Sequence, residues 1–114
     1  MTALHNISGE AGEIEAAKYL EKQGFKIIDR NWKTKWCEVD IIALKDKVMH
    51  FVEVKYRSSS GQGLGLDYIN SKKLRQMQRA ADSWVHMNDW PGEYILSAAQ
   101  VSGDNFEVDF IEEV

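Results

Sequence analysis

Long apolar runs are missing from this 114-residue sequence, and cysteine and proline each occur only once. No stretch approaches the roughly 20 apolar residues that a membrane-spanning helix needs, so we expect no membrane partner. The single cysteine, Cys37, cannot form a disulfide within the chain, which favours the reducing cytoplasm. The first residues also lack the basic start and apolar stretch of a secretory signal, in agreement with a cytoplasmic location.

A surplus of positive charge is missing as well, because the formal net charge is −4. The cations are nevertheless concentrated in one segment, residues 55–79, whereas residues 104–114 carry five acids and no base. The cations of that segment are Lys55, Arg57, Lys72, Lys73, Arg75 and Arg79. Local charge matters more than the total for a groove that binds phosphates. The segment therefore predicts a nucleic-acid surface, and a merely solvated basic helix face stays open as the alternative.

The length suits one domain, residues 1–114, and a hydrophobic fraction of 44% is ordinary for a globular fold. Helices are predicted at residues 8–24 and 71–88, where apolar residues recur at helical spacing. Ser8 is the expected N-cap of the first helix, and Gly24 is expected to end it in a left-handed turn.

Five strands are predicted between and after these helices, together with a loop rich in serine and glycine at residues 58–66. The strands are expected at residues 25–32, 37–44, 48–57, 94–101 and 106–112. The resulting order is α-β-β-β-α-β-β. It predicts an α/β fold with a central mixed five-stranded sheet flanked by helices.

Charged side chains on the second and third predicted strands form the strongest functional signal. If residues 46–47 make a two-residue loop, counting outward along the hairpin places Asp40 opposite Glu53. Alternation along the strand puts Lys55 on the same face as Glu53. A register shift of two residues keeps the two acids on one face, whereas a shift of one residue separates them.

The simplest alternative is that these charges face solvent on an amphipathic hairpin. The same face, however, also carries Ile42 and Phe51. The opposite face is apolar, with Val39, Ile41, Ala43, Val52 and Val54. A hairpin that is apolar on both faces is expected to be covered on both. The acids would then be partly buried and close together, and like charges at short range resist ionisation unless a cation joins them.

A divalent cation and Lys55 would supply that positive charge. The carboxylates of Asp40 and Glu53 offer the hard oxygen ligands that Mg²⁺ or Mn²⁺ accepts. Such an ion polarises a phosphate and helps to generate hydroxide, which is the chemistry of phosphodiester hydrolysis. Lys55 is expected to orient the nucleophile or to stabilise developing charge. Glu13, on the inward side of the first helix, is a further candidate ligand, and Glu38 ranks below it.

Aromatic and basic residues alternate at residues 32–36, which read Trp-Lys-Thr-Lys-Trp. Surfaces that stack nucleic-acid bases have this composition. We favour the other interpretation, in which the tryptophans anchor a hairpin turn.

The order of Asp40, twelve residues, and then Glu53, Val54 and Lys55 resembles the PD-(D/E)XK nuclease motif. More closely, the chain resembles the YraN-like family of small bacterial proteins, which are similar to archaeal Holliday-junction resolvases within the restriction-endonuclease-like fold. The matching stretches are residues 9–13, 16–20, 30–32, 38–43, 51–57 and 72–74. One departure is Cys37, where the family usually has glycine.

The resemblance implies a restriction-endonuclease-like domain that cuts DNA, on branched or otherwise structured substrates. It implies metal-binding roles for Asp40 and Glu53 and a catalytic role for Lys55. Glu13 falls where resolvases carry a helix carboxylate. Substrates with two-fold symmetry would favour a homodimer.

Two other functions stay open. A catalytically silent nucleic-acid-binding module would use Lys72, Lys73 and Arg75 and would need no metal. An interaction protein would instead use the acidic C-terminal edge around Glu112 and Glu113.

Overall fold

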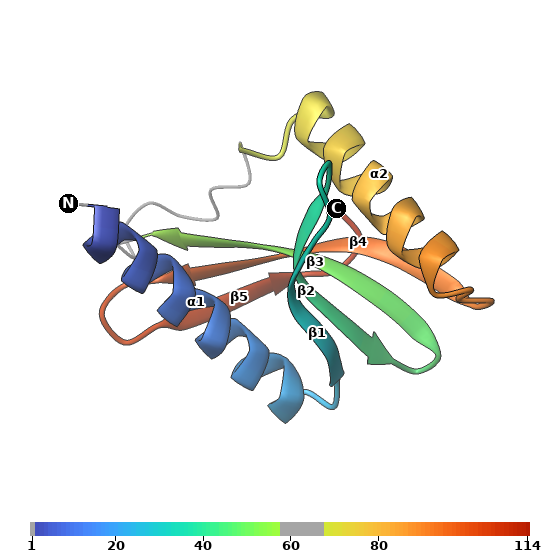
Figure 1. Ribbon diagram of the computed structural model, residues 1–114. Helices are drawn as coiled ribbons and strands as arrows, with labels where there is room; N and C mark the ends of the chain where they lie inside the picture. The colour runs from blue at the N-terminus through green and yellow to red at the C-terminus, as the bar shows by residue number, and fades with distance from the viewer. Residues whose placement is uncertain (1, 58–67) are drawn as a thin grey trace.

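The computed structural model describes residues 2–57 and 68–114 (Figure 1). The elements, in chain order, are α1 (Thr2–Lys22), β1 (Lys26–Lys33), β2 (Glu38–Lys45), β3 (Val48–Arg57), α2 (Ser71–Met87), β4 (Glu93–Ser102) and β5 (Glu107–Ile111). This order confirms the predicted succession of helices and strands. The loop predicted at residues 58–66 lies outside the described residues. None of the described helices is both long enough and apolar enough to span a membrane.

The five strands form one mixed sheet in the order β1-β2-β3-β4-β5. Neighbouring strands are antiparallel except for β3 and β4, which run parallel. Two parallel neighbours need a crossover connection, and α2 lies within this one. Figure 1 shows α1 and α2 on opposite faces of the sheet. The predicted α/β class, with a mixed five-stranded sheet flanked by helices, is confirmed.

Alternation along β2 and β3 divides the apolar side chains between two cores. Ile41 and Val52 point toward α1 and pack with Leu20. Ile42 and Phe51 point to the other face, where they pack in one cluster with the α2 residues Ala80, Ala81 and Trp84. The hairpin is therefore covered on both faces, which is why its apolar residues do not follow a simple inside–outside alternation.

The predicted start of the first helix is wrong. α1 begins at Thr2, so Ser8 lies inside the helix and is not its N-cap. Residues 2–7 contain neither proline nor glycine, so nothing in that stretch stops the helix from extending upstream of a plausible cap. The predicted end is confirmed. Gly24 has a φ of 94°, and the Phe25 N–H donates to the Leu20 carbonyl at 2.9 Å.

The turn between β2 and β3 fixes the register of the hairpin. Asp46 and Lys47 have φ values of 51° and 67°, so both central residues are left-handed, as in a type I′ turn. The turn pairs Lys45 with Val48, and the antiparallel pairing continues to Ile41 and Val52. The register that puts Asp40 and Glu53 on one face is therefore confirmed.

The second helix begins with a side-chain cap. The Lys73 N–H donates to Oδ1 of Asn70 at 2.9 Å, which satisfies one of the free backbone donors of the first turn. Met77, Ala80, Ala81 and Trp84 are buried on the inner face of α2. This packing holds the first turn of α2, and with it Lys73, over the β3 strand.

Candidate active site

Strands β2 and β3 separate just beyond the point where their pairing ends. Ile41 and Val52 are the last paired residues, whereas β2 stays paired with β1 as far as Glu38. At the separation the side chain of Asp40 takes the place of a backbone acceptor. Its Oδ2 accepts a hydrogen bond from the Val54 N–H at 2.8 Å. The Asp40 carboxylate is thereby fixed beside the segment of β3 that carries Glu53.

The environment of Asp40 makes its ionised form unfavourable. Burial is the largest cause and the neighbouring Glu53 carboxylate the second, and together they raise the pKa of Asp40 to about 7. The hydrogen bond from Val54 acts in the opposite direction, and Glu13 and Glu38 add smaller repulsions. A carboxyl group in this condition is a candidate for binding a cation or a proton.

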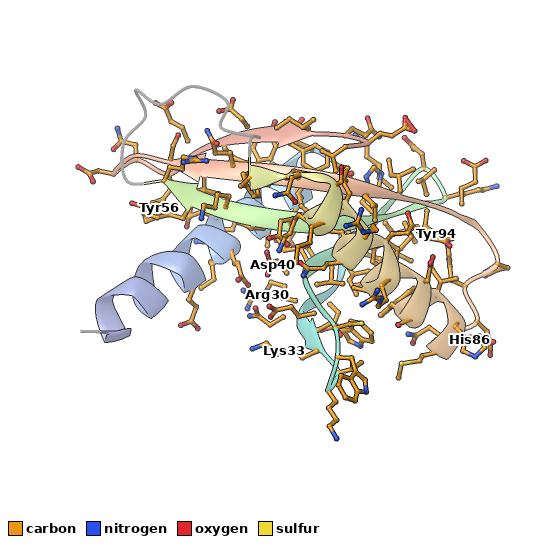
Figure 2. The ribbon with its side chains drawn as sticks, turned by 90° about the horizontal axis from the view of Figure 1, so that it is seen from above. Arg30, Lys33, Asp40, Tyr56, His86 and Tyr94 are labelled. Carbon is orange, nitrogen blue, oxygen red and sulfur yellow. The ribbon has the colours of Figure 1, made fainter. Side chains whose placement is uncertain are left out.

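Glu13 reaches this region from α1. The helix approaches β3 closely at Gly12, where an added Cβ would lie only 3.3 Å from the Cβ of Tyr56. The Oε1 atom of Glu13 is buried and has no hydrogen-bond partner among the described residues. Burial raises the pKa of Glu13, and the nearby Arg30 opposes that shift. Figure 2 shows Arg30 and Asp40 between α1 and α2, on the two strands of the β1–β2 hairpin.

Glu53 is held by a cation from the other helix. The Lys73 Nζ lies 2.8 Å from Glu53 Oε2, and the two side chains are 32% and 20% exposed. The ion pair joins the first turn of α2 to the middle of β3. Lys73, one of the predicted phosphate-binding cations, is therefore in contact with a predicted metal ligand.

Lys55 is exposed on β3, two residues beyond Glu53. Its Nζ lies 5.9 Å from the centre of the Tyr68 ring. The Tyr68 hydroxyl oxygen is buried without a hydrogen-bond partner among the described residues. Burial raises the pKa of Tyr68 to about 12, with further contributions from Glu53 and Asp40. The sequence does not single out Tyr68, because no apolar residues recur around it at helix or strand spacing. The only available signal was its place just before the helix cap.

The remaining predicted phosphate-binding residues lie on two elements. Arg57 is at the end of β3, where its Nε donates to Gln100 Oε1 at 3.3 Å. Lys72, Arg75 and Arg79 are exposed on α2. The structure thus places these three cations on the helix that also supplies Lys73 to Glu53.

The carboxylates of Asp40, Glu53 and Glu13 do not by themselves form a complete metal-binding site. Within residues 2–57 and 68–114, no three His, Cys, Asp or Glu side chains form a group that would hold a metal ion by themselves. Mg²⁺ is commonly held by one or two carboxylates, with water and substrate phosphates as the other ligands. Asp40, Glu53 and the unpartnered Glu13 oxygen are donors of this kind, so the residues present fit a hard divalent cation.

The chain belongs to the family described as "Uncharacterised protein family UPF0102", whose model matches residues 12–112. This confirms the expected YraN-like family. A UPF0102 protein of Cytophaga hutchinsonii is 32% identical over 108 residues, which cover 95% of this chain and 96% of the relative. A UPF0102 protein of Flavobacterium johnsoniae is 34% identical over 96% of this chain and 94% of its own. Another, of Chlorobaculum parvum, is 42% identical over 73% of this chain and 64% of its own.

Proposed function

We propose that the protein is a metal-dependent endonuclease that hydrolyses DNA phosphodiester bonds, with branched or otherwise structured DNA as its substrate. One observation carries the proposal. Asp40 and Glu53 come together where β2 leaves β3, and their proximity and burial raise the pKa of Asp40 to about 7. Partly buried acids that repel each other without a functional ligand would only destabilise the fold. A cation bound between them removes that repulsion.

Each residue has a distinct role in this proposal. Asp40 and Glu53 hold Mg²⁺ or Mn²⁺, and Glu13 approaches from α1 as a third carboxylate. When bound, the ion supplies Lewis-acid polarisation of the phosphate and lowers the pKa of a water ligand. The exposed ammonium group of Lys55 orients the attacking water or stabilises charge that develops on the phosphate oxygens.

The cations on α2 and at the end of β3 position the DNA backbone. Lys72, Arg75 and Arg79 are exposed, and Arg57 lies on the face of β3 that carries Glu53. Contacts of Lys and Arg with phosphates give affinity but carry no sequence information. A substrate chosen by its branched or distorted shape is compatible with such a surface.

The first test is cleavage. Wild-type protein with Mg²⁺ or Mn²⁺ should cut labelled flapped or four-way DNA, and Glu53→Gln and Lys55→Ala should each reduce the rate at least a hundredfold. Glu113→Gln, purified in the same way, is the control because it changes an acid far along the chain. Cutting that survives both site substitutions would come from a contaminant and would contradict the proposal.

The second test is metal binding without catalysis. Calorimetry with Mn²⁺ should detect binding to the wild type that Asp40→Asn abolishes. DNA binding that needs no divalent ion and is unaffected by Asp40→Asn, without cleavage, would favour the silent binding module. Loss of a protein partner on charge reversal at Glu112 and Glu113, without DNA binding, would favour the interaction protein.

A further inference from the structure

A groove of about 260 Å³ connects the candidate active site with the turn between β1 and β2. Its lining includes Trp36 and Cys37 on the turn, Glu53 on β3, and Lys73 and Arg79 on α2. Figure 1 shows the turn beside the first turns of α2. A predicted metal ligand and an exposed aromatic side chain therefore line the same groove.

Trp36 is 81% exposed, the highest value among the exposed large hydrophobic residues described. Trp32, by contrast, is partly buried against the core on the α2 face. The preferred interpretation of the Trp-Lys-Thr-Lys-Trp segment, in which tryptophans anchor the turn, therefore holds for Trp32 and not for Trp36. Its position beside a charged groove makes this large aromatic side chain accessible to a ligand that enters the groove.

The turn that carries Trp36 is held in place by hydrogen bonds. Thr34 Oγ1 accepts from the Trp36 and Cys37 backbone N–H groups at 3.1 and 3.0 Å, and the Thr34 N–H donates to the Cys37 carbonyl at 2.8 Å. Cys37 Sγ lies 3.9 Å from Ser83 Oγ on α2. The indole is thus presented to solvent by an ordered backbone, so little entropy would be lost when a ligand stacks on it.

Charges of both signs surround the indole. Lys35 Nζ lies 5.2 Å from the centre of the Trp36 ring, and the groove is lined by Lys73 and Arg79 together with the acids Glu38 and Glu53. Lys73 pairs with Glu53, so Lys35 and Arg79 are the cations that we expect to meet the phosphates of a strand. Proteins that bind single strands combine a basic groove for the backbone with aromatic rings on which bases stack. A base inside a continuous duplex already has both faces covered by its neighbours. Apart from the outermost pair at a duplex end, only an unpaired, unstacked base offers a free face to the indole.

We propose that Trp36 and this groove bind an unpaired nucleotide of the DNA, stacked on the indole, next to the phosphate at Asp40 and Glu53. The inference rests on the proposed function for the position of that phosphate. It narrows the substrate to DNA that has a single-stranded segment at the cleavage site, such as a flap, a gap or an open junction. Blunt, fully paired duplex is bound through its phosphates alone.

The experiment measures binding by fluorescence anisotropy in EDTA, so that cleavage plays no part. The probes are a labelled oligo(dT) strand and a blunt duplex of equal length. Trp36→Ala should weaken binding of the single strand about tenfold, as expected for loss of one base–aromatic stack, and change duplex binding less than twofold. Trp36→Phe should retain most of the single-strand affinity. Met87→Ala, which removes another exposed apolar side chain, is the matched control and should change neither.

The result that would overturn the inference is equal single-strand affinity for the wild type and Trp36→Ala, or an equal loss for both probes. A probe with abasic positions adds a check on the wild type itself. The wild type should bind the abasic probe with the affinity that Trp36→Ala has for the intact strand. Abasic-probe binding as tight as that of the intact strand would also overturn the inference.

Cleavage by the wild type is measured separately with Mn²⁺. If the wild type does not cut while Trp36→Ala loses single-strand binding, the nuclease proposal fails and the stacking site stands. If the wild type cuts while Trp36→Ala binds single strands normally, the nuclease proposal stands and the stacking site fails.

Discussion

At the residue scale, opposing influences act on the ionisation of the Asp40 carboxyl group. Burial and the Glu53 carboxylate disfavour its ionised form, and the Val54 N–H favours it. The first two prevail, which brings the pKa of Asp40 to about 7. Ionisation of Asp40 therefore weakens the fold at about pH 7 and above, which agrees with the proposed role of Asp40 in binding a cation.

This leads to a pH dependence of stability. Between its ordinary value of 3.8 and about 7, the Asp40 carboxyl holds a proton in the folded chain and has lost it in the unfolded chain. The folded state then binds more protons, so the free energy of unfolding falls as pH rises through this window. In metal-free buffer, Asp40→Asn should remove that fall and be roughly 2 to 4 kcal/mol more stable than the wild type at pH 8.

Urea melts of both proteins at pH 5 and pH 8 measure this difference. Asp104→Asn, which changes an exposed acid at the turn before β5, is the control and should follow the wild type. Wild-type and Asp40→Asn stabilities that fall in parallel with pH would show that Asp40 ionises normally in the folded protein.

The sequence predicts some residues of the candidate site better than others. Strand alternation and loop length, which are local properties, predict that Asp40 and Glu53 lie together. The Lys73–Glu53 ion pair and the position of Tyr68 depend on where α2 begins relative to the sheet. That relation comes from packing between segments far apart in sequence, and neither periodicity nor spacing encodes it. The metal, catalytic and DNA-binding roles of all these residues stay predictions.

At the scale of elements, the β2–β3 hairpin carries the site because a short turn fixes its register. The sequence predicts this pairing, although lysine is not a residue that the second central position of a type I′ turn prefers. The start of α1 was not predictable in the same way, since Ser8 suits a cap and is also tolerated within a helix. The separation of β2 from β3 beyond Ile41 was not predictable either, because it depends on side-chain hydrogen bonding at Asp40.

A substitution in the turn between β2 and β3 should therefore increase the stability of the protein. Lys47 is exposed and has a φ of 67°, a conformation that is unfavourable for a residue with a Cβ. Lys47→Gly should stabilise the protein by about 0.5 to 1 kcal/mol, after allowance for the greater freedom of glycine in the unfolded chain. Thermal melts should show a midpoint higher by roughly 2 to 6 °C. Lys47→Ala removes the same side chain but keeps the Cβ, so an equal rise for alanine would contradict the backbone explanation.

At the scale of the whole molecule, cations and acids lie in different parts of a chain whose formal net charge is −4. The sheet separates α1 from α2, and α2 carries the exposed cations Lys72, Arg75 and Arg79. The acidic residues near the C-terminus lie in the turn before β5, on β5 and after it, at the other end of the strand order from β1. The sequence predicted this segregation from charge counts alone. A homodimer stays a prediction, for which sedimentation velocity is the direct measurement.

The segregation predicts that DNA affinity depends on where charge is removed and not on how much. Replacing Lys72, Arg75 and Arg79 with alanine removes three positive charges and takes the net charge from −4 to −7. Replacing Lys18, Lys22 and Lys26, at the end of α1 and the start of β1, gives the same net charge. Each phosphate contact contributes about 0.9 to the slope of log affinity against log salt for a duplex. The α2 variant should therefore lose up to about 2.7 from that slope and bind more weakly at every salt concentration.

The α1 variant should keep the wild-type slope, because its lysines lie away from α2. Anisotropy titrations of one duplex between 50 and 200 mM NaCl, a range over which such slopes are well resolved, compare the two at about equal total charge. Equal slopes for both variants would mean that the whole-molecule charge governs binding and that α2 is only a solvated basic face.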